Sequence, residues 1–575
     1  MLKLIRLLKP YTGTIIFIAI LFLTQAMVDL SLPTFMAEIV DNGIVKGNLP
    51  YIYKTGLIMI SIAMLGVLCA LTAGYFSSRT SLGFSKTLRA MIFTKAQDFS
   101  LNEYDTIGSA SLITRATNDV AQVQQALIIM LSMMMRAPLM CIGGIIMAVS
   151  RDRHLSLVFT VAVPVLGLII YLVQKNAIPL FISMQKKLDR LNLVIREKLT
   201  GVREVRAFDM IAHEEKKFDE ANASLTETAL SLANLMAFIM PAMMAAMNFT
   251  MLAIVWFGGL RLAAGKMHFG DIMAFIQYVN LILFSLMMVS MLFILIPRAE
   301  VSAGRINEVL DIQPSILDPK NPAKRRTGKG KLEFKNVSFT YKGAKQKAIS
   351  GISFSAGPGE VTAIIGGTGS GKSTLVNLIP RFYDVEEGSI EVDSMDVRDY
   401  PQAELRPLIG YVAQKAMLFT GTVADNIRLG NESAGMEDII KAAKTAQAHD
   451  FIQAMPAGYD SILAQAGRNL SGGQKQRLCI ARALAVRPEI YIFDDSFSAL
   501  DFKTDSMLRA ELKKELKDST VIIVAQRVTT VMDADRIIVL EDGRAAGMGT
   551  HKELFATCKV YREIVLSQVS PEEVS

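Results

Sequence analysis

Cysteine and histidine are scarce in this sequence, which has 4 cysteines and 5 histidines among 575 residues. The cysteines lie far apart, and Cys69 and Cys141 fall within long apolar runs. This spacing argues against both a disulfide framework and a zinc site. The histidines are equally scattered along the chain.

Charge is scarce through most of the first 300 residues. Two apolar runs contain a few charged residues: Tyr11–Val40 contains Asp29 and Glu38, and Val120–Ser150 contains Arg136. Each run is long enough to cross a hydrocarbon core of about 30 Å as a helix. A hydrophobic content of 51% and a mean hydropathy of +0.35 exclude an ordinary soluble enzyme. Six membrane spans are therefore predicted, the other four in fully uncharged runs: Thr55–Ser78, Leu155–Gln174, Thr228–Leu260 and Ile272–Pro297.

The distribution of lysine and arginine orients these spans. Six spans place both termini on one side, and the segments on that side carry 18 basic residues against 6 in the opposite loops. Because basic loops stay inside, we expect both termini to be cytoplasmic in a multi-pass cell-membrane protein. The net charge of +7 then reflects topology and an anionic lipid surface, and nucleic-acid binding is the less favoured explanation.

The pattern changes after residue 311. Residues 312–330 contain three prolines and the basic stretch "KRRTGKG", which is typical of an exposed linker. From residue 331 to 575 short apolar strands alternate with helical segments, which predicts an α/β domain with a largely parallel sheet. Because this domain follows the last span, the charge distribution places it in the cytoplasm. The pair Asp542–Gly543 predicts a late hairpin. The predicted fold is thus multidomain: a six-helix, all-α transmembrane domain over residues 1–311, a linker over residues 312–330 and an α/β domain over residues 331–575.

Two long polar segments separate apolar runs on the cytoplasmic side, "NEYDTIGSASLITRATNDVAQVQQ" and "REKLTGVREVRAFDMIAHEEKKF". Their helical spacing predicts membrane helices that continue into the cytoplasm, each pair joined by a short crossing piece that contacts the α/β domain. A plain solvated loop is the alternative, although structureless loops of this length are uncommon.

The stretch "GGTGSGKST" follows the predicted strand "VTAII" and opens a helix, which is the context of a phosphate-binding P-loop. Lys372 would reach the β and γ phosphates of ATP, and the Ser373 hydroxyl would bind Mg²⁺. Asp494 ends the apolar strand of "IYIFDD" and could hold the same Mg²⁺. The residues expected around the nucleotide are Gly366, Gly367, Thr368, Gly369, Ser370, Gly371, Lys372, Ser373 and Thr374.

A second phosphate-binding pattern occurs in "NLSGGQKQR", where a serine and two glycines precede a helix. The P-loop already serves this chain's nucleotide, so the second pattern is predicted to serve a nucleotide bound by another copy of the domain. Its contact residues would be Ser471, Gly472, Gly473 and Gln474.

With "LSGGQ" lying between a P-loop and an "FDD" strand, the sequence resembles an ABC exporter half-transporter along nearly its whole length. In that family two ATP molecules are held head to tail between one domain's P-loop and the other domain's LSGGQ. The resemblance implies that Tyr341 stacks on adenine, that Gln414 senses Mg²⁺ and the membrane domain, and that Asp501 lies across a dimer interface. It also implies that the two cytoplasmic crossing pieces are coupling helices.

Three positions depart from the family pattern. Asp495 stands where the catalytic glutamate belongs, Gln526 replaces a histidine that contacts the γ-phosphate, and Gln465–Ala466 replaces a Glu-Arg pair. Aspartate is shorter by about 1–1.5 Å, and a misplacement of about 1 Å can cost on the order of 100-fold in rate. Glutamine donates a hydrogen bond but cannot become cationic. We therefore expect ATP to be bound but poorly hydrolysed at this chain's P-loop, in a heterodimer with a half-transporter that retains the Glu and His.

The substrate is less well defined by the sequence. Methionines cluster in "MLSMMMRAPLM", "FIMPAMMAAMNFTM" and "SLMMVSML", and they would either line an adaptable cavity or simply pack. Asp29 and Arg136 are functional candidates within the membrane, where Asp29 would favour cationic substrates. Asp41 is a candidate for an external gate, with a hydrated helix end as the alternative. Export of hydrophobic or amphipathic drugs is favoured. Lipid or peptide export, siderophore import, a homodimeric exporter and an ATP-gated regulator that pumps nothing remain as alternatives.

Overall fold

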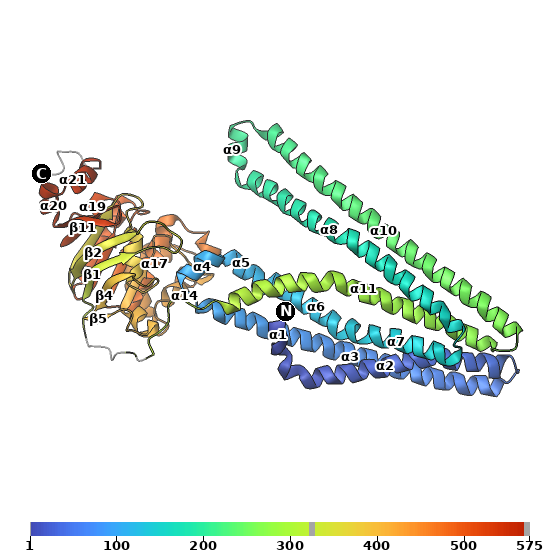
Figure 1. Ribbon diagram of the computed structural model, residues 1–575. Helices are drawn as coiled ribbons and strands as arrows, with labels where there is room; N and C mark the ends of the chain where they lie inside the picture. Colours follow the sequence, from blue (N-terminus) through green and yellow to red (C-terminus); the bar gives the residue numbers. More distant parts are fainter. Residues whose placement is uncertain (1, 321, 323–327, 569–575) are drawn as a thin grey trace. The chain divides into compact units, whose positions relative to one another are not determined.

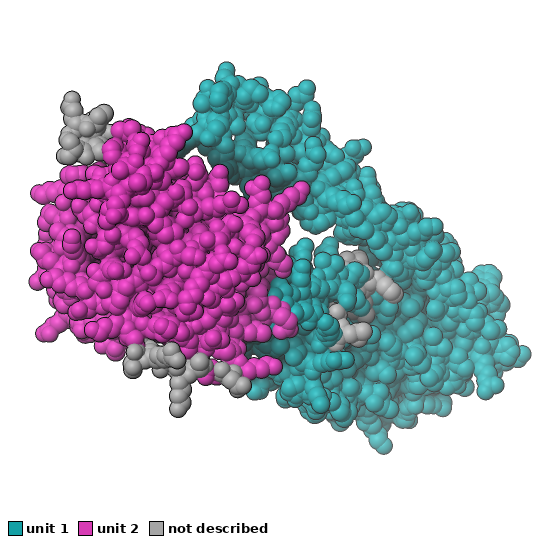
Figure 2. All heavy atoms as spheres, turned by 60° about the vertical axis from the view of Figure 1, so that its left-hand side comes forward, with its two compact units in different colours: residues 1–97, 109–312 teal, residues 98–108, 313–575 magenta. Residues whose placement is uncertain are grey.

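The computed structural model describes residues 2–320, 322 and 328–568, without the side chains of residues 2 and 290–295. It forms two compact units (Figure 2). The first contains Met1–Gln97 and Ser109–Ile312, and the second contains Asp98–Gly108 and Gln313–Ser575. The short segment Asp98–Gly108 thus belongs to the second unit although its flanking helices belong to the first.

The first unit is entirely helical, and six helical runs in the described residues are long and apolar enough to cross a membrane. The six predicted spans are confirmed, including the two that carry charged residues. The helices are α1 (Leu2–Ile5), η1 (Arg6–Tyr11), α2 (Thr12–Glu38), η2 (Ile39–Ile44), α3 (Leu49–Gln97), α5 (Ser109–Thr114), η3 (Arg115–Asp119), α6 (Val120–Ile129), η4 (Met130–Met134), α7 (Met135–Arg151), η5 (Leu155–Leu157), α8 (Val158–Thr200), α9 (Val202–Ala207), α10 (Ile211–Ala263) and α11 (Phe269–Asp311).

Two charged residues of the membrane spans neutralise each other. Arg136 of α7 donates a hydrogen bond to the Asp29 carboxylate of α2 at 2.9 Å. A lone charge within the bilayer is costly, and pairing lowers that cost. The two candidate residues are thus paired with each other, and the role of Asp29 toward cationic substrates stays a prediction. Asp41 likewise has a local partner, because its carboxylate accepts a hydrogen bond from the Gly270 N–H in the first turn of α11 at 2.8 Å.

Helices α8 and α10 pack along each other and are joined by α9 at one end, where the pair diverges from the rest of the bundle (Figure 1). Leu191, Val194 and Ala221 form a buried cluster between the two helices in this extension. Helices α8 and α10, of 43 and 53 residues, are both longer than a bilayer crossing requires, and the short helix α9 joins their ends. The cytoplasmic location of this end stays a prediction. No residue of α9 is buried in the first unit.

The second unit contains a six-stranded sheet of order β12-β11-β3-β10-β9-β6, in which every pairing except β11–β12 is parallel. A four-stranded antiparallel sheet has the order β2-β1-β4-β5, and β7 pairs with β8. The strands are β1 (Leu332–Phe339), β2 (Ile349–Ala356), β3 (Val361–Gly366), β4 (Glu387–Val392), β5 (Met395–Asp396), β6 (Ile409–Val412), β7 (Gly421–Thr422), β8 (Ile462–Leu463), β9 (Ile490–Asp494), β10 (Thr520–Val524), β11 (Arg536–Glu541) and β12 (Arg544–Gly549).

Helices complete this unit, beginning with α4 (Leu101–Ile107) from the segment between α3 and α5. The others are α12 (Lys372–Leu378), α13 (Gln402–Leu405), η6 (Arg406–Leu408), α14 (Val423–Arg428), α15 (Met436–Thr445), α16 (His449–Gln453), η7 (Gly458–Asp460), η8 (Gln465–Gly467), α17 (Gly472–Val486), α18 (Phe502–Glu515), α19 (Val528–Val531), α20 (His551–Thr557) and α21 (Lys559–Leu566).

The predicted α/β domain with a mainly parallel sheet is confirmed, and the structure adds a smaller antiparallel sheet. The segment "KLEFKNVSFTY" forms β1 of the antiparallel sheet and does not join the parallel one. The predicted hairpin at Asp542–Gly543 joins β11 to β12, with positive φ angles of 46° and 77° that such a turn requires. Most of the predicted linker stretch "KRRTGKG" lies outside the described residues.

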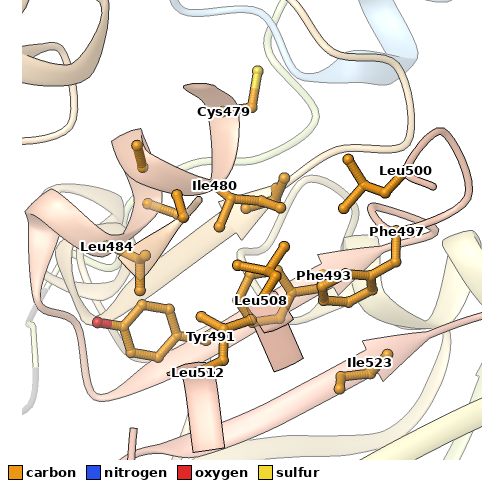
Figure 3. Packing of buried hydrophobic residues seen from close by; sticks show 14 of the residues in the cluster. Cys479, Ile480, Leu484, Tyr491, Phe493, Phe497, Leu500, Leu508, Leu512 and Ile523 are labelled. Carbon is orange, nitrogen blue, oxygen red and sulfur yellow. The ribbon is translucent and has the colours of Figure 1, made fainter. Parts of the chain in front are cut away.

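Strand β9 is buried along its whole length because both of its faces are covered. Tyr491 and Phe493 face a cluster that includes Leu508 and Ile523 (Figure 3), whereas Ile492 faces the opposite cluster. Burial on both faces explains why the sequence of β9 is continuously apolar and does not alternate. The strand holds Asp494 rigidly at its carboxyl end.

Candidate nucleotide-binding site

The loop between β3 and α12 carries the residues of the predicted phosphate-binding site. Gly371 precedes α12 with a φ of 96°, and a Cβ there would come within 2.7 Å of the Ala348 carbonyl oxygen. Only glycine fits this position without strain. The Lys372 ammonium donates to the carbonyl oxygens of Gly366 at 2.9 Å and Gly367 at 2.7 Å. Burial lowers the pKa of Lys372, opposed by the nearby carboxylates.

Asp494 and Ser373 lie together beside this loop, with the Ser373 hydroxyl donating to the carboxylate at 3.0 Å. Tyr411 donates more weakly to the other carboxylate oxygen at 3.5 Å. Burial raises the pKa of Asp494, the Ser373 hydrogen bond opposes the rise, and the negative charge of Asp495 adds to it. A carboxylate and a hydroxyl are hard oxygen ligands, and a neighbouring negative charge also favours a divalent cation. The pair therefore fits Mg²⁺.

The register of three adjacent parallel strands brings the next part of the site together. Val412 of β6 pairs with Phe493 of β9, and Val524 of β10 pairs with Asp494. The carboxyl ends of parallel strands meet at one sheet edge, so the residues that follow each strand become neighbours. These residues are Gln414, Asp495 and Gln526.

One carboxylate oxygen of Asp495 accepts hydrogen bonds from both amides, at 3.2 Å from Gln414 and 3.0 Å from Gln526. The backbone of Asp495 has a positive φ of 47°. Burial raises its pKa, and the Gln414 hydrogen bond opposes that rise. Two of the departures noted in the sequence, Asp495 and Gln526, are thus bonded to each other. Gln526 occupies the position at which the family has a histidine, and its expected role there stays a prediction.

The LSGGQ segment forms the N-terminus of α17. The Ser471 side chain accepts a hydrogen bond from the Gln474 N–H, and the Gln474 side chain accepts one from the Ser471 N–H. A Cβ on Gly473 would come within 3.0 Å of the Ala499 carbonyl oxygen. Asp501 similarly caps α18 by accepting from the Thr504 N–H at 3.0 Å. The hydrogen bonds of the Ser471 side chain and N–H thus lie within its own helix cap.

Tyr341 lies beside the P-loop, where its hydroxyl hydrogen-bonds the Thr374 hydroxyl at 2.9 Å. Its ring packs edge-on against Tyr383, with ring centroids 5.4 Å apart. The sequence analysis missed Tyr383 and Tyr411, which contact predicted site residues. The two adjacent aromatic residues in "RFYD", close behind the P-loop helix, were the available signal for Tyr383.

This architecture defines a class of protein: a P-loop ATPase domain in one chain with six membrane-spanning helices. Residues 15–287 match the family described as ABC transporter transmembrane region, and residues 349–498 match the family described as ABC transporter. The chain is 41% identical over 98% of its length to an uncharacterized ABC transporter ATP-binding protein of Mycobacterium tuberculosis, covering 97% of that protein. The chain belongs to the ABC transporter family.

A second relative is a putative multidrug export ATP-binding/permease protein of Bacillus subtilis, 30% identical with 99% of each chain covered. The fold resembles that of a bacterial Atm1-family ABC exporter solved with ATP bound, with a TM-score of 0.81 at 24% identity, covering 97% of this chain and 98% of that one. The protein is thus a multi-pass membrane half-transporter of the exporter type, whose cytoplasmic domain binds and hydrolyses ATP.

Proposed function

We propose that this chain is one half of a heterodimeric exporter of hydrophobic or amphipathic compounds, and that its own P-loop site binds ATP but hydrolyses it poorly. The observation that carries this proposal is the tethering of Asp495 by Gln414 and Gln526. A half-transporter with an intact glutamate and histidine would supply the competent site.

The P-loop residues hold the nucleotide in this proposal. Lys372 binds the β and γ phosphates, and Tyr341 stacks on adenine. Ser373 and Asp494, with Gln414 nearby, hold Mg²⁺, which when bound offsets phosphate charge. The hydrogen bond of 3.0 Å between the Ser373 hydroxyl and the Asp494 carboxylate supports a shared cation, because the two oxygens are close enough to bind the same ion.

Slow hydrolysis follows from the surroundings of Asp495. A general base must lie within hydrogen-bond reach of the attacking water. The aspartate is one methylene short, and its carboxylate is directed toward two amides. The hydrogen bonds from Gln414 and Gln526 stabilise the ionised form and oppose the rise in pKa that burial causes. Slow hydrolysis is therefore attributed to the length and direction of the side chain. Gln526 adds no positive charge to a developing phosphate transition state.

A partner chain is supported by surfaces that the single chain leaves uncovered. Ser471 begins α17 in a geometry suited to phosphate, with backbone N–H groups at a helix N-terminus. Phe208, which directly follows α9, is 76% exposed. An apolar ring so exposed at the end of a helical extension favours contact with a partner. Two identical chains would have two impaired sites, so we favour a different half-transporter.

The transported compounds are proposed to be apolar or amphipathic. A groove of about 780 Å³ between α8 and α10 has a mainly apolar lining that includes Val161, Phe249 and Phe257, with His154 and Arg261 among its polar residues. Such a lining suits ligands with an apolar body and one polar group. The relative from Bacillus subtilis named as a putative multidrug exporter supports the same substrate class.

Two measurements test the proposal. Purified alone, this chain should hydrolyse ATP very slowly, whereas the complex with its partner half-transporter should turn over at a rate typical of ABC exporters. Inside-out vesicles that contain the complex should accumulate a fluorescent amphipathic dye such as ethidium only with ATP. Vigorous turnover by the homodimer would contradict the heterodimer. ATPase activity without any dye movement would favour a regulator that pumps nothing.

A further inference from the structure

Helix α4 is bound to the ATPase unit by side chains at both of its ends. Its N-cap residue Ser100 hydrogen-bonds the Ser315 hydroxyl at 2.9 Å, and Glu103 completes a capping box. Near the other end, the Tyr383 hydroxyl donates to the Asp105 carboxylate at 3.2 Å. Burial raises the pKa of Tyr383, and the Asp105 charge adds to the rise, so the hydroxyl keeps its proton and remains a donor.

The ring of Tyr383 has a second set of neighbours on the nucleotide side. It packs edge-on against Tyr341 at a centroid distance of 5.4 Å and an angle of 85°, and it contacts Phe339 at 5.3 Å. Tyr341 in turn bonds Thr374 in the first turn of α12, at 2.9 Å. A single residue therefore touches both α4 and the proposed adenine-stacking ring.

The turn that carries Tyr383 is held firmly. Arg381 is 4% exposed, has a φ of 54°, and donates to the Leu317 carbonyl at 3.1 Å and to Asp384 at 2.8 Å. Phe382 packs edge-on against Tyr411 at 5.7 Å. A side chain on such a constrained turn has little freedom to move independently of its neighbours. A shift of the Tyr341 ring should therefore also shift Tyr383 and its contact with α4.

We propose that Tyr383 is a positioning residue that links adenine stacking on Tyr341 to the stability of α4 on the ATPase domain. A base that stacks on Tyr341 fixes the ring against which Tyr383 packs. This holds the Tyr383 hydroxyl toward Asp105 and anchors α4. By thermodynamic reciprocity, displacement of α4 lowers the affinity for the adenine base. This inference rests on the proposed adenine contact of Tyr341.

Hydrogen exchange of the 98–108 segment in the purified full-length complex tests the link. Saturating ATP should slow exchange of the α4 amides by about threefold to tenfold, the factor expected from one net hydrogen bond. Ribose 5-triphosphate lacks the base, so it should slow exchange of the α4 amides by less than about twofold. That factor is smaller than even a weak net hydrogen bond would produce. Tyr383→Phe keeps the ring and removes the donor, so ATP should then have no more effect than the abasic compound. Asp105→Ala should behave in the same way, and the double variant should be no worse than either.

Tyr459→Phe is the matched control, because it removes a tyrosine hydroxyl that bonds His449 at 2.9 Å, away from these contacts. It should respond to ATP as the wild type does. An undiminished ATP effect in Tyr383→Phe would overturn the proposal, and so would equal slowing by ATP and ribose 5-triphosphate in the wild type. Photolabelling with 8-azido-ATP reports nucleotide binding on each chain separately. Failure to label this chain would overturn the proposed nucleotide site itself, and the link with it.

Discussion

Replacing Asp495 by asparagine distinguishes a tethered residue from a working base. The asparagine keeps the side-chain length and one carbonyl oxygen, so Gln414 and Gln526 can still donate to it. Only the charge is lost. A hydrogen bond to a charged group contributes about 1.5–3 kcal/mol and a neutral one about 0.5–1.5 kcal/mol. The two hydrogen bonds from Gln414 and Gln526 should therefore together become weaker by about 2–3 kcal/mol.

If hydrolysis takes place in the partner's site, the weaker hydrogen bonds loosen the nucleotide site of this chain only. They do not affect cleavage of the phosphate bond in the other site. Turnover of the heterodimer should therefore change by less than about threefold, since the chemical step elsewhere keeps its general base. The acid-to-amide change at the partner's catalytic glutamate removes that base. Its cost should be on the order of 100-fold or more.

Both variants should be compared in one heterodimer preparation, by phosphate release at saturating Mg-ATP. Labelling with 8-azido-ATP on this chain confirms that the Asp495→Asn site still binds nucleotide. Equal losses of turnover from the two changes would mean that Asp495 acts as a base despite its length and its two amide partners. The proposal that the heterodimer has one impaired and one competent ATP site would then be wrong.

Three further predictions concern other parts of the chain. Lys372→Ala should weaken 8-azido-ATP labelling of this chain by about tenfold or more, because a charged contact with phosphate contributes over about 1.4 kcal/mol; unchanged labelling would refute the assigned role. Ser471→Arg should abolish most turnover of the heterodimer by placing a bulky cation where the partner's γ-phosphate would lie, and surviving activity would exclude that arrangement. Arg136→Ala should destabilise the detergent-purified protein by about 1–3 kcal/mol, because it leaves the partly buried Asp29 unpaired. The double variant Asp29→Asn/Arg136→Ala should recover part of that loss in a thermal unfolding assay, and no recovery would argue against the pair.

Local sequence patterns were sufficient for the six spans, the parallel sheet and the position of Asp494 at a strand end. Helix length and hydrophobic runs depend on residues near one another in the chain, and bilayer thickness sets the required length. The separate antiparallel sheet that contains β1 was not predicted, because a strand's own sequence does not specify which neighbour it pairs with. The roles of individual residues around the nucleotide stay predictions until they are tested.

The sequence by itself determined that this chain crosses the membrane six times, belongs with the ABC exporters and lacks the usual glutamate and histidine. Only the tertiary structure decided that Asp495 is bonded by Gln414 and Gln526, which lie 81 and 31 residues away. The pairing of Asp29 with Arg136, 107 residues apart, was equally hidden. Such contacts depend on strand register and helix packing, which bring distant residues together through the summed burial of many side chains. No short stretch of sequence contains that sum.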